Sequence, residues 1–134
     1  EKNDLGIWRP SNGDWYNIRS SNGGVFAERF GQTGDRIAPA DYDGDGKADI
    51  AIYRPSTGLW VVRNSATATY SYSVFGASAD IPVSGDYDGD GKADIGVWRP
   101  SDRTWYIQRS ENGQFIVFPW GQNGDRPTPS AYGN

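Results

Sequence analysis

The ten-residue segment DYDGDGKADI occurs twice in the chain, at residues 41–50 and 86–95. Each copy has aspartates at positions 1, 3, 5 and 9 and a glycine at position 6. Calcium takes about six to eight oxygen ligands, and alternate carboxylates on a tightly curled loop point toward one centre. The glycine permits the sharp turn that such a loop needs. The segment therefore predicts a calcium-binding loop, and its duplication predicts two Ca²⁺ sites per chain.

The ligands are expected at fixed positions of this loop. Four carboxylates supply side-chain oxygens, and the lysine at position 7 supplies its backbone carbonyl while its side chain faces solvent. Without a cation, four carboxylates so close together would repel one another strongly. The candidate ligands are Asp41, Asp43, Asp45, Lys47 and Asp49 in the first loop, and Asp86, Asp88, Asp90, Lys92 and Asp94 in the second.

Other interpretations of the loop fit less well. A solvated acidic turn without an ion would not account for the spacing, the glycine and the duplication together. Magnesium prefers rigid octahedral sites that keep several waters. An EF-hand or a dockerin places a helix after the loop, whereas here a strand-like segment follows and ends at a proline.

The composition argues against several functional classes. The chain has no His and no Cys, which removes Ser-His-Asp triads, thiol chemistry, disulfides and most metal-dependent hydrolases. The glutamates are isolated, so a paired-carboxylate glycosidase has no obvious acid, and we expect no enzyme. The net charge of −4 argues against nucleic acid as a partner. No apolar run is long enough for a membrane helix, so no membrane insertion is expected.

The elements that position the loops are themselves repeated. DLGIWRP, DIAIYRP and DIGVWRP begin at residues 4, 49 and 94, which gives a period of 45 residues along the chain. Abundant Gly, Pro and aromatic residues are typical of short strands with tight turns. We expect a single repeat domain over residues 1-134, divided into repeats 4-48, 49-93 and 94-134.

Three or four short strands per repeat predict an all-β protein of β-propeller-type blades with antiparallel strands. The first strand of each repeat, such as Ile50-Ala51-Ile52-Tyr53, is apolar on both faces, so we expect it to be buried on both. A short fourth extended segment is expected at Ile81-Pro82-Val83. A threefold β-trefoil or β-prism is the competing architecture.

The segments DYDGDGKADIAIYRPSTGLW and DYDGDGKADIGVWRPSDRTW resemble bacterial FG-GAP/VCBS repeats, which are related to the calcium-bearing blades of integrin α-subunits. The FG pair matches Phe30-Gly31 and Phe75-Gly76, with Trp120-Gly121 as a variant. The resemblance implies a β-propeller module of secreted or cell-surface proteins, with a structural or adhesive role toward proteins or glycans. The alternatives are a carbohydrate-binding, lectin-like module and an accessory domain of an extracellular enzyme.

The third loop departs from this pattern. Ala131 and Gly133 replace its first two carboxylates, and Asp4 aligns with the last ligand, Asp49. Closed propellers have about four to eight blades, and terminal repeats expose apolar flanks unless something covers them. We therefore expect a homo-oligomer, either a ring or a filament; the alternative is that the missing blades belong to a larger parent chain.

Recurring residues outside the loops are interpreted mainly as structural. Each arginine of the Arg-Pro-Ser step is expected to pair with an aspartate or to cover an aromatic ring. Tyr70 and Tyr72 alternate with serines and predict a half-exposed strand, which is the candidate contact surface of the second repeat. The expected core tryptophans are Trp8, Trp15, Trp60, Trp98, Trp105 and Trp120; the arginines are Arg9, Arg54 and Arg99, with Asp35, Asp80 and Asp125 as partners.

Overall fold

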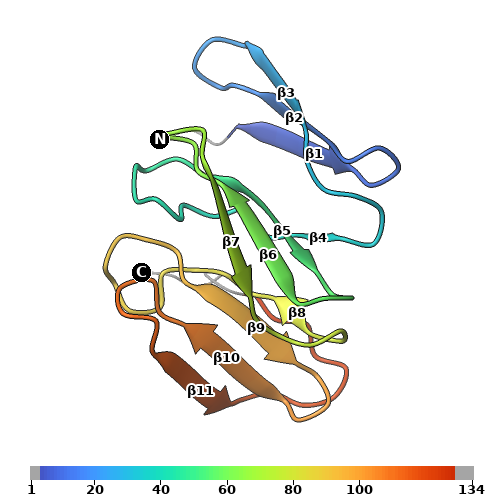
Figure 1. The fold of residues 1–134 in the computed structure, drawn as a ribbon, viewed down its shortest axis with the longest axis vertical. Helices are drawn as coiled ribbons and strands as arrows, with labels where there is room; N and C mark the ends of the chain where they lie inside the picture. Colours follow the sequence, from blue (N-terminus) through green and yellow to red (C-terminus); the bar gives the residue numbers. More distant parts are fainter. Residues whose placement is uncertain (1–3, 129–134) are drawn as a thin grey trace. The chain divides into compact units, whose positions relative to one another are not determined.

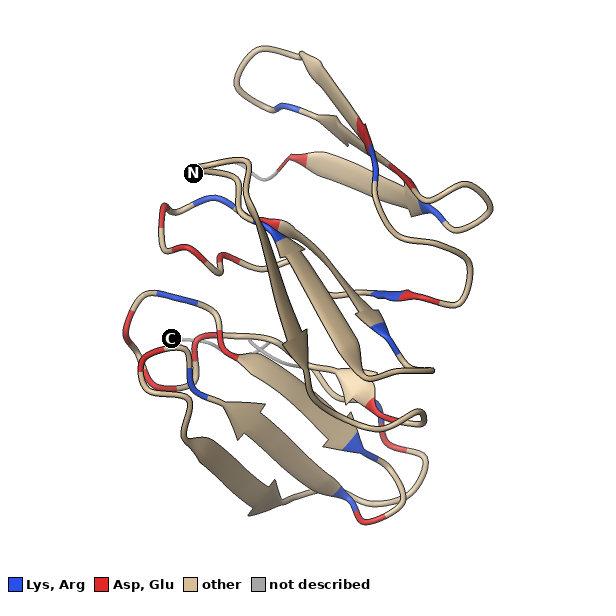
Figure 2. Cartoon of the chain, viewed as in Figure 1, with Lys and Arg blue, Asp and Glu red and all other residues tan. Residues whose placement is uncertain are grey.

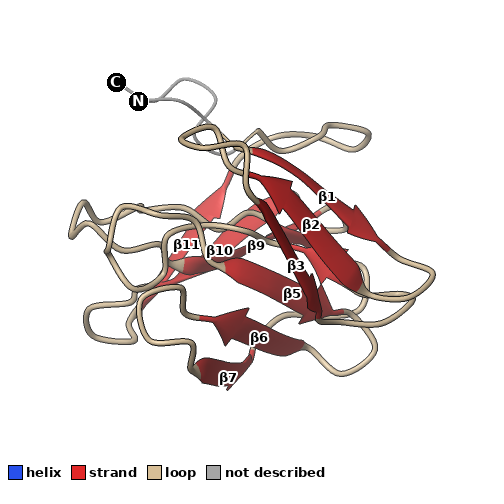
Figure 3. Cartoon of the chain, turned by 90° about the horizontal axis from the view of Figure 1, so that it is seen from above, coloured by secondary structure: helices blue, strands red, loops and turns tan. Residues whose placement is uncertain are grey.

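A computed structural model of the chain describes residues 4–128. Over this range the chain forms strands and no helix, which confirms the predicted all-β class (Figures 1 and 3). It divides into two units, residues 1–35 and 36–134, and each unit is described by itself. The strands are β1 (Leu5–Arg9), β2 (Asp14–Ile18), β3 (Val25–Arg29), β4 (Arg36–Ile37), β5 (Ile50–Arg54), β6 (Leu59–Arg63), β7 (Tyr70–Val74), β8 (Ile81–Pro82), β9 (Ile95–Arg99), β10 (Thr104–Gln108) and β11 (Phe115–Pro119).

The first unit is a three-stranded antiparallel sheet in the order β1-β2-β3. Trp15 is buried in it, and its indole Nε1 donates to the carbonyl of Phe30 at 2.9 Å. Leu5 and Ile7, on the aliphatic face of β1, are 73% and 58% exposed. The expected burial of the first strand on both faces is therefore wrong for β1, because the described residues of this unit form a single sheet.

The second unit contains two four-stranded antiparallel sheets, β4-β5-β6-β7 and β8-β9-β10-β11 (Figure 1). In each sheet a two-residue strand before the Asp-rich loop pairs with the first long strand after it. β8 covers Ile81–Pro82, as the sequence predicts. Four antiparallel strands in sequential order are the construction of a propeller blade, so the blade prediction is favoured over the trefoil or prism.

The two sheets of this unit share an apolar core. Tyr53, Trp60 and Val62 lie on one face of the first sheet and are buried together with Val97 of the second. Phe75 stacks on Phe115 with ring centroids 5.7 Å apart. β5 is buried along four of its five residues and β9 along three, as predicted for strands that are apolar on both faces.

Polar contacts of the core also recur from one repeat to the next. Trp60 Nε1 donates to the carbonyl of Phe75 at 2.9 Å, which repeats the bond made by Trp15. Arg99 donates to both carboxylate oxygens of buried Asp80, at 2.8 and 2.9 Å, and covers the ring of Tyr106. The predicted Arg–Asp pairing is thereby confirmed for Arg99.

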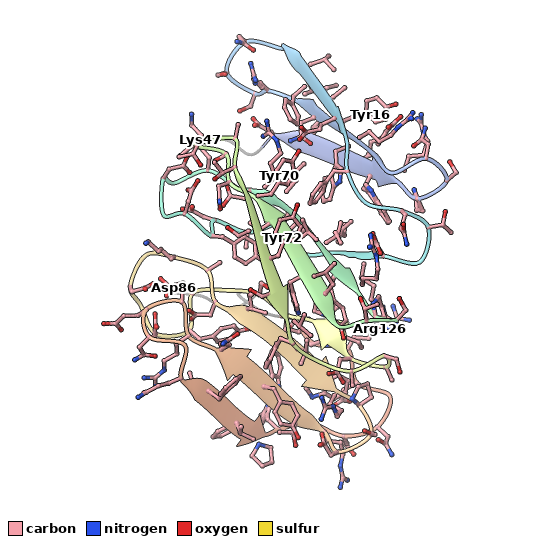
Figure 4. The ribbon with its side chains drawn as sticks, in the orientation of Figure 1. Tyr16, Lys47, Tyr70, Tyr72, Asp86 and Arg126 are labelled. Atoms are coloured by element: carbon pink, nitrogen blue, oxygen red, sulfur yellow. The ribbon has the colours of Figure 1, made fainter. Side chains whose placement is uncertain are left out.

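Other predicted residues divide between core and surface. Trp15, Trp60 and Trp98 are buried, as expected, whereas Trp120 is 70% exposed. Tyr70 and Tyr72 are exposed on β7 (Figure 4), as predicted. The altered third loop, with Ala131 and Gly133, lies outside the described residues. Within the described range, no helix has the length and hydropathy required to cross a membrane.

Candidate calcium sites

Both Asp-rich loops lie in the second unit, between β4 and β5 and between β8 and β9 (Figure 2). Each loop is closed by an isolated antiparallel bridge, Ala40 with Asp49 and Gly85 with Asp94. Inside the loops, Gly46 and Gly91 have φ values of +85° and +91°. This left-handed conformation disfavours any residue with a Cβ, which explains the glycine at position 6.

The loops gather their first three aspartates around one point. Asp41, Asp43 and Asp45 each offer a carboxylate oxygen within 4.8 Å of the others, and Asp86, Asp88 and Asp90 do the same. The chain's own amides hold the first carboxylate in place: Asp41 Oδ1 accepts from Gly44 N at 2.8 Å, and Asp41 Oδ2 accepts from Gly46 N at 2.8 Å. The second loop repeats both bonds at Asp86.

The fourth aspartate of each loop has a different environment. Asp49 is completely buried, and its Oδ2 accepts from the amides of Tyr42 at 2.8 Å and Asp43 at 3.2 Å. Its Oδ1 accepts from Ser65 N at 2.6 Å. Asp94 is equally buried and has the equivalent bonds to Tyr87 N and Ser110 N. These aspartates fasten the loop to the sheet, and their predicted role as ligands, like that of the Lys47 and Lys92 carbonyls, stays a prediction.

A serine completes each loop, and the sequence analysis did not identify it. Ser65, in the turn between β6 and β7, donates its hydroxyl to Asp45 Oδ2 at 3.0 Å. Ser110 does the same for Asp90 Oδ2 at 3.0 Å. The sequence does mark this serine, because a serine recurs with the 45-residue period at positions 20, 65 and 110. In the first unit, Ser20 N donates to Asp4 Oδ1 at 2.8 Å, which is the counterpart of the bond from Ser65 N to Asp49.

The charges of the second loop are not fully compensated by the protein. Burial, and then the nearby carboxylates of Asp94, Asp90 and Asp86, raise the pKa of Asp88 above its ordinary value. Asp88 Oδ2 is a buried oxygen with no hydrogen-bond partner among the described residues. By contrast, the amides of Lys47 and Lys92 hold the pKa values of Asp45 and Asp90 below the usual range.

This donor set fits a calcium ion. All its side-chain ligands are hard carboxylate oxygens, which calcium prefers over the nitrogen and sulfur ligands that zinc takes. The oxygen Asp88 Oδ2 has no partner among residues 4–128, which points to a partner such as a bound cation. Lys47 and Asp86, labelled in Figure 4, mark the two loops, and the lysine side chains at position 7 are exposed, as predicted.

Comparisons with known proteins agree with this description of the loops. Residues 41–97 match the family model of the FG-GAP-like repeat. The matched segment contains both Asp-rich loops and the four strands between them, β5, β6, β7 and β8. Neither the comparison with curated proteins nor that with solved structures found a match. Residues 41–97 of this chain are therefore similar to the FG-GAP-like repeat, as the sequence resemblance predicted.

Proposed function

We propose that this chain is a non-enzymatic, calcium-stabilised repeat module of secreted or cell-surface proteins, with a structural or adhesive role. The observation that carries the proposal is the pair of carboxylate triads, each held by the same backbone amides in an FG-GAP-like segment. In this role the loops connect one blade to the next, and the ion offsets the negative charge of the carboxylates, including Asp88 Oδ2, which has no partner among the described residues.

In the proposed site, some aspartates bind the ion and others hold the loop in place. Three side chains per loop, Asp41, Asp43 and Asp45 in the first, converge to offer oxygen ligands. Asp49, anchored by three amide donors, keeps the loop against the sheet. When bound, the ion supplies positive charge that offsets the repulsion among the carboxylates. Binding to the folded state alone would add about 2.7 kcal/mol per site at a calcium concentration of 100 Kd.

Calorimetric titration of the metal-free chain with CaCl₂ tests this function. We expect a stoichiometry of two ions per chain and a melting temperature that rises with calcium. Asp45→Ala and Asp90→Ala should each reduce the stoichiometry to one, because each removes one member of a single triad. The matched control is Asp102→Ala, which removes an aspartate outside both loops and should leave two ions bound.

The titration also contains the result that would refute the proposal. If the wild-type chain melts at the same temperature in a chelator and in millimolar calcium, the ion has no structural role. A heat of binding that survives in the double variant Asp45→Ala/Asp90→Ala would place the calcium elsewhere on the chain.

Self-association is part of the proposed function. Both the first sheet and the last sheet of the chain expose large apolar side chains, such as Leu5, Phe115 and Trp120. Exposed apolar surface of this kind marks interaction sites in soluble proteins. We expect the purified chain to form a ring or a filament, and a concentration-independent monomer in sedimentation velocity would contradict this expectation.

A lectin-like role is the second candidate, and one exposed indole favours it. Trp120 is 70% exposed and lines a shallow hollow with Asp102 and Arg103. An exposed indole beside charged groups can stack on a sugar ring while polar groups bind its hydroxyls. Saturable quenching of tryptophan fluorescence on a glycan panel, lost in Trp120→Ala, would support this candidate; no response on the panel would exclude it.

A further inference from the structure

We propose that the chain associates head to tail, with the β1 face of one copy packed on the outer face of β9-β10-β11 of a second copy. This inference rests on the proposed self-association and names the two surfaces that form it. The occupant of each surface is thus another copy of the same chain. The second unit already contains a junction of this kind between its own two sheets.

The internal junction supplies the template. One face of the β4-β5-β6-β7 sheet, with Tyr53, Trp60 and Val62, is covered by the opposite face of the β8-β9-β10-β11 sheet, with Ile95 and Val97. We call the former the leading face and the latter the trailing face. Because side chains alternate along a strand, both faces can be followed through the repeat period into the other sheets.

The equivalent faces of the β1-β2-β3 sheet and of the last sheet carry exposed apolar side chains, although the centre of the last sheet's leading face, with Trp98 and Ile107, is buried. On the trailing face of the β1-β2-β3 sheet, Leu5 and Ile7 take the positions of Ile95 and Val97. Leu5 is 73% exposed and Ile7 is 58% exposed. The leading face of the last sheet has Phe118, which is 60% exposed, and a partly exposed Trp105 in place of fully buried Trp60. Each open face thus has the apolar character of one half of the internal junction.

The two exposed faces differ from the internal junction at positions that would face each other. At the internal junction, a groove of about 370 Å³ is lined by Ser71 and Ser73 on one side and by Gln108 on the other. At the open leading face the two serines are replaced by Ile116 and Phe118, and at the open trailing face Gln108 is replaced by Ile18. Both surfaces become more apolar at the places that would face each other.

The two faces differ from the internal junction in the same direction. They have large aliphatic and aromatic side chains at positions where the internal junction has serine and glutamine. A second copy presents the matching surface at each end, so the contact is heterologous rather than symmetric.

The test exchanges residues between equivalent positions of the repeats. Ile116→Ser/Phe118→Ser copies the β7 residues into β11, and Ile18→Gln copies the β10 residue into β2. Ile18 and Phe118 are 49% and 60% exposed, so their replacement should change the melting temperature little. Ile116 packs against the cluster of Val83, Trp98 and Ile107, so its replacement should lower the melting temperature, and association is therefore measured at a temperature at which every variant is folded. In sedimentation velocity with calcium present, each variant should associate at least tenfold more weakly than wild type.

Mixing the two variants identifies the geometry. Each variant retains one intact face, so an equimolar mixture should form a 1:1 dimer that grows no further. The matched control is Tyr72→Ser on exposed β7, a position on neither proposed surface, and it should associate like wild type.

Three results would overturn the inference, and they are distinguishable. A monomeric wild-type chain would remove the proposed self-association together with these surfaces. Association unchanged in both variants would leave self-association standing but would place it elsewhere. Loss of association in Ile116→Ser/Phe118→Ser alone, with Ile18→Gln unaffected, would indicate a symmetric contact between two last sheets.

Discussion

Asp49→Asn separates the structural role of the fourth loop aspartate from any role as a calcium ligand. The buried carboxylate accepts three amide hydrogen bonds, from Tyr42, Asp43 and Ser65. Asparagine can accept at one of the two oxygen positions, but its NH₂ group must then face the amide donors at the other. Leaving at least one buried donor unsatisfied, and losing the charge that strengthens the remaining bonds, costs about 2–4 kcal/mol.

A second effect of Asp49→Asn, weaker repulsion among the loop carboxylates, raises the free energy of unfolding and has to be screened out. Removing the Asp49 charge lowers the repulsion among the loop carboxylates, which would stabilise the variant. At about 1 M salt the Debye length falls to about 3 Å, so repulsion between the exposed carboxylates is largely screened. Urea unfolding at this salt concentration, with chelator and without calcium, therefore reports mainly the lost hydrogen bonds.

The readout is tryptophan fluorescence, and the control is the exposed member of the same loop. We expect the free energy of unfolding of Asp49→Asn to fall by the stated 2–4 kcal/mol, as also for Asp94→Asn. Asp45→Asn, whose bonds are exposed, should unfold like wild type under these conditions. A free energy for Asp49→Asn within about 0.5 kcal/mol of wild type would refute the anchoring role of this carboxylate.

Two further predictions concern contacts away from the loops. Arg99→Ala leaves buried Asp80 without its bidentate partner, so the free energy of unfolding should fall by about 2–4 kcal/mol in urea titrations, whereas exposed Arg9→Ala should change it little. Arg29, followed by the Tyr16 hydroxyl, lowers the pKa of Asp14, and the Tyr106 hydroxyl lowers that of Asp102. Because a folded-state pKa below 3.8 stabilises the fold above pH 3.8, this stability should be lost as the pH falls through the folded pKa. Urea midpoints from pH 6 down to about pH 2.5 should show the loss, and Asp14→Asn should reduce it; an unchanged pH profile would contradict this assignment.

The repeat period predicted most of the architecture, because equivalent positions in a repeat have equivalent environments. The strands, the two loops and the Arg99–Asp80 pair all follow from the 45-residue spacing. What the period cannot predict is which neighbour satisfies a backbone amide. The buried anchoring of Asp49 depends on Ser65, which lies across the β6–β7 turn, and nothing in the spacing of the loop itself refers to that turn.

The exposure of β1 shows a second limit. Leu5 and Ile7 have the same pattern as Ile50 and Ile52, yet the former pair is exposed and the latter is buried. A strand's own pattern states which faces are apolar, but burial also requires a second surface to pack against. For β1, that second surface is not determined by the pattern of the strand.

The two loops are joined to each other as well as to their sheets. The carbonyl of Asp41 accepts a hydrogen bond from Ala93 N at 2.7 Å, and Ala93 directly precedes the buried anchor Asp94. The first aspartate of the first loop, Asp41, is thus fixed by its own loop amides through the carboxylate and by the second loop through the carbonyl. An ion that orders Asp41 also restrains the residue before Asp94, and therefore the start of β9. Because β9 forms the trailing face that covers Tyr53 and Trp60, calcium at the first loop would stabilise the packing of one sheet on the next.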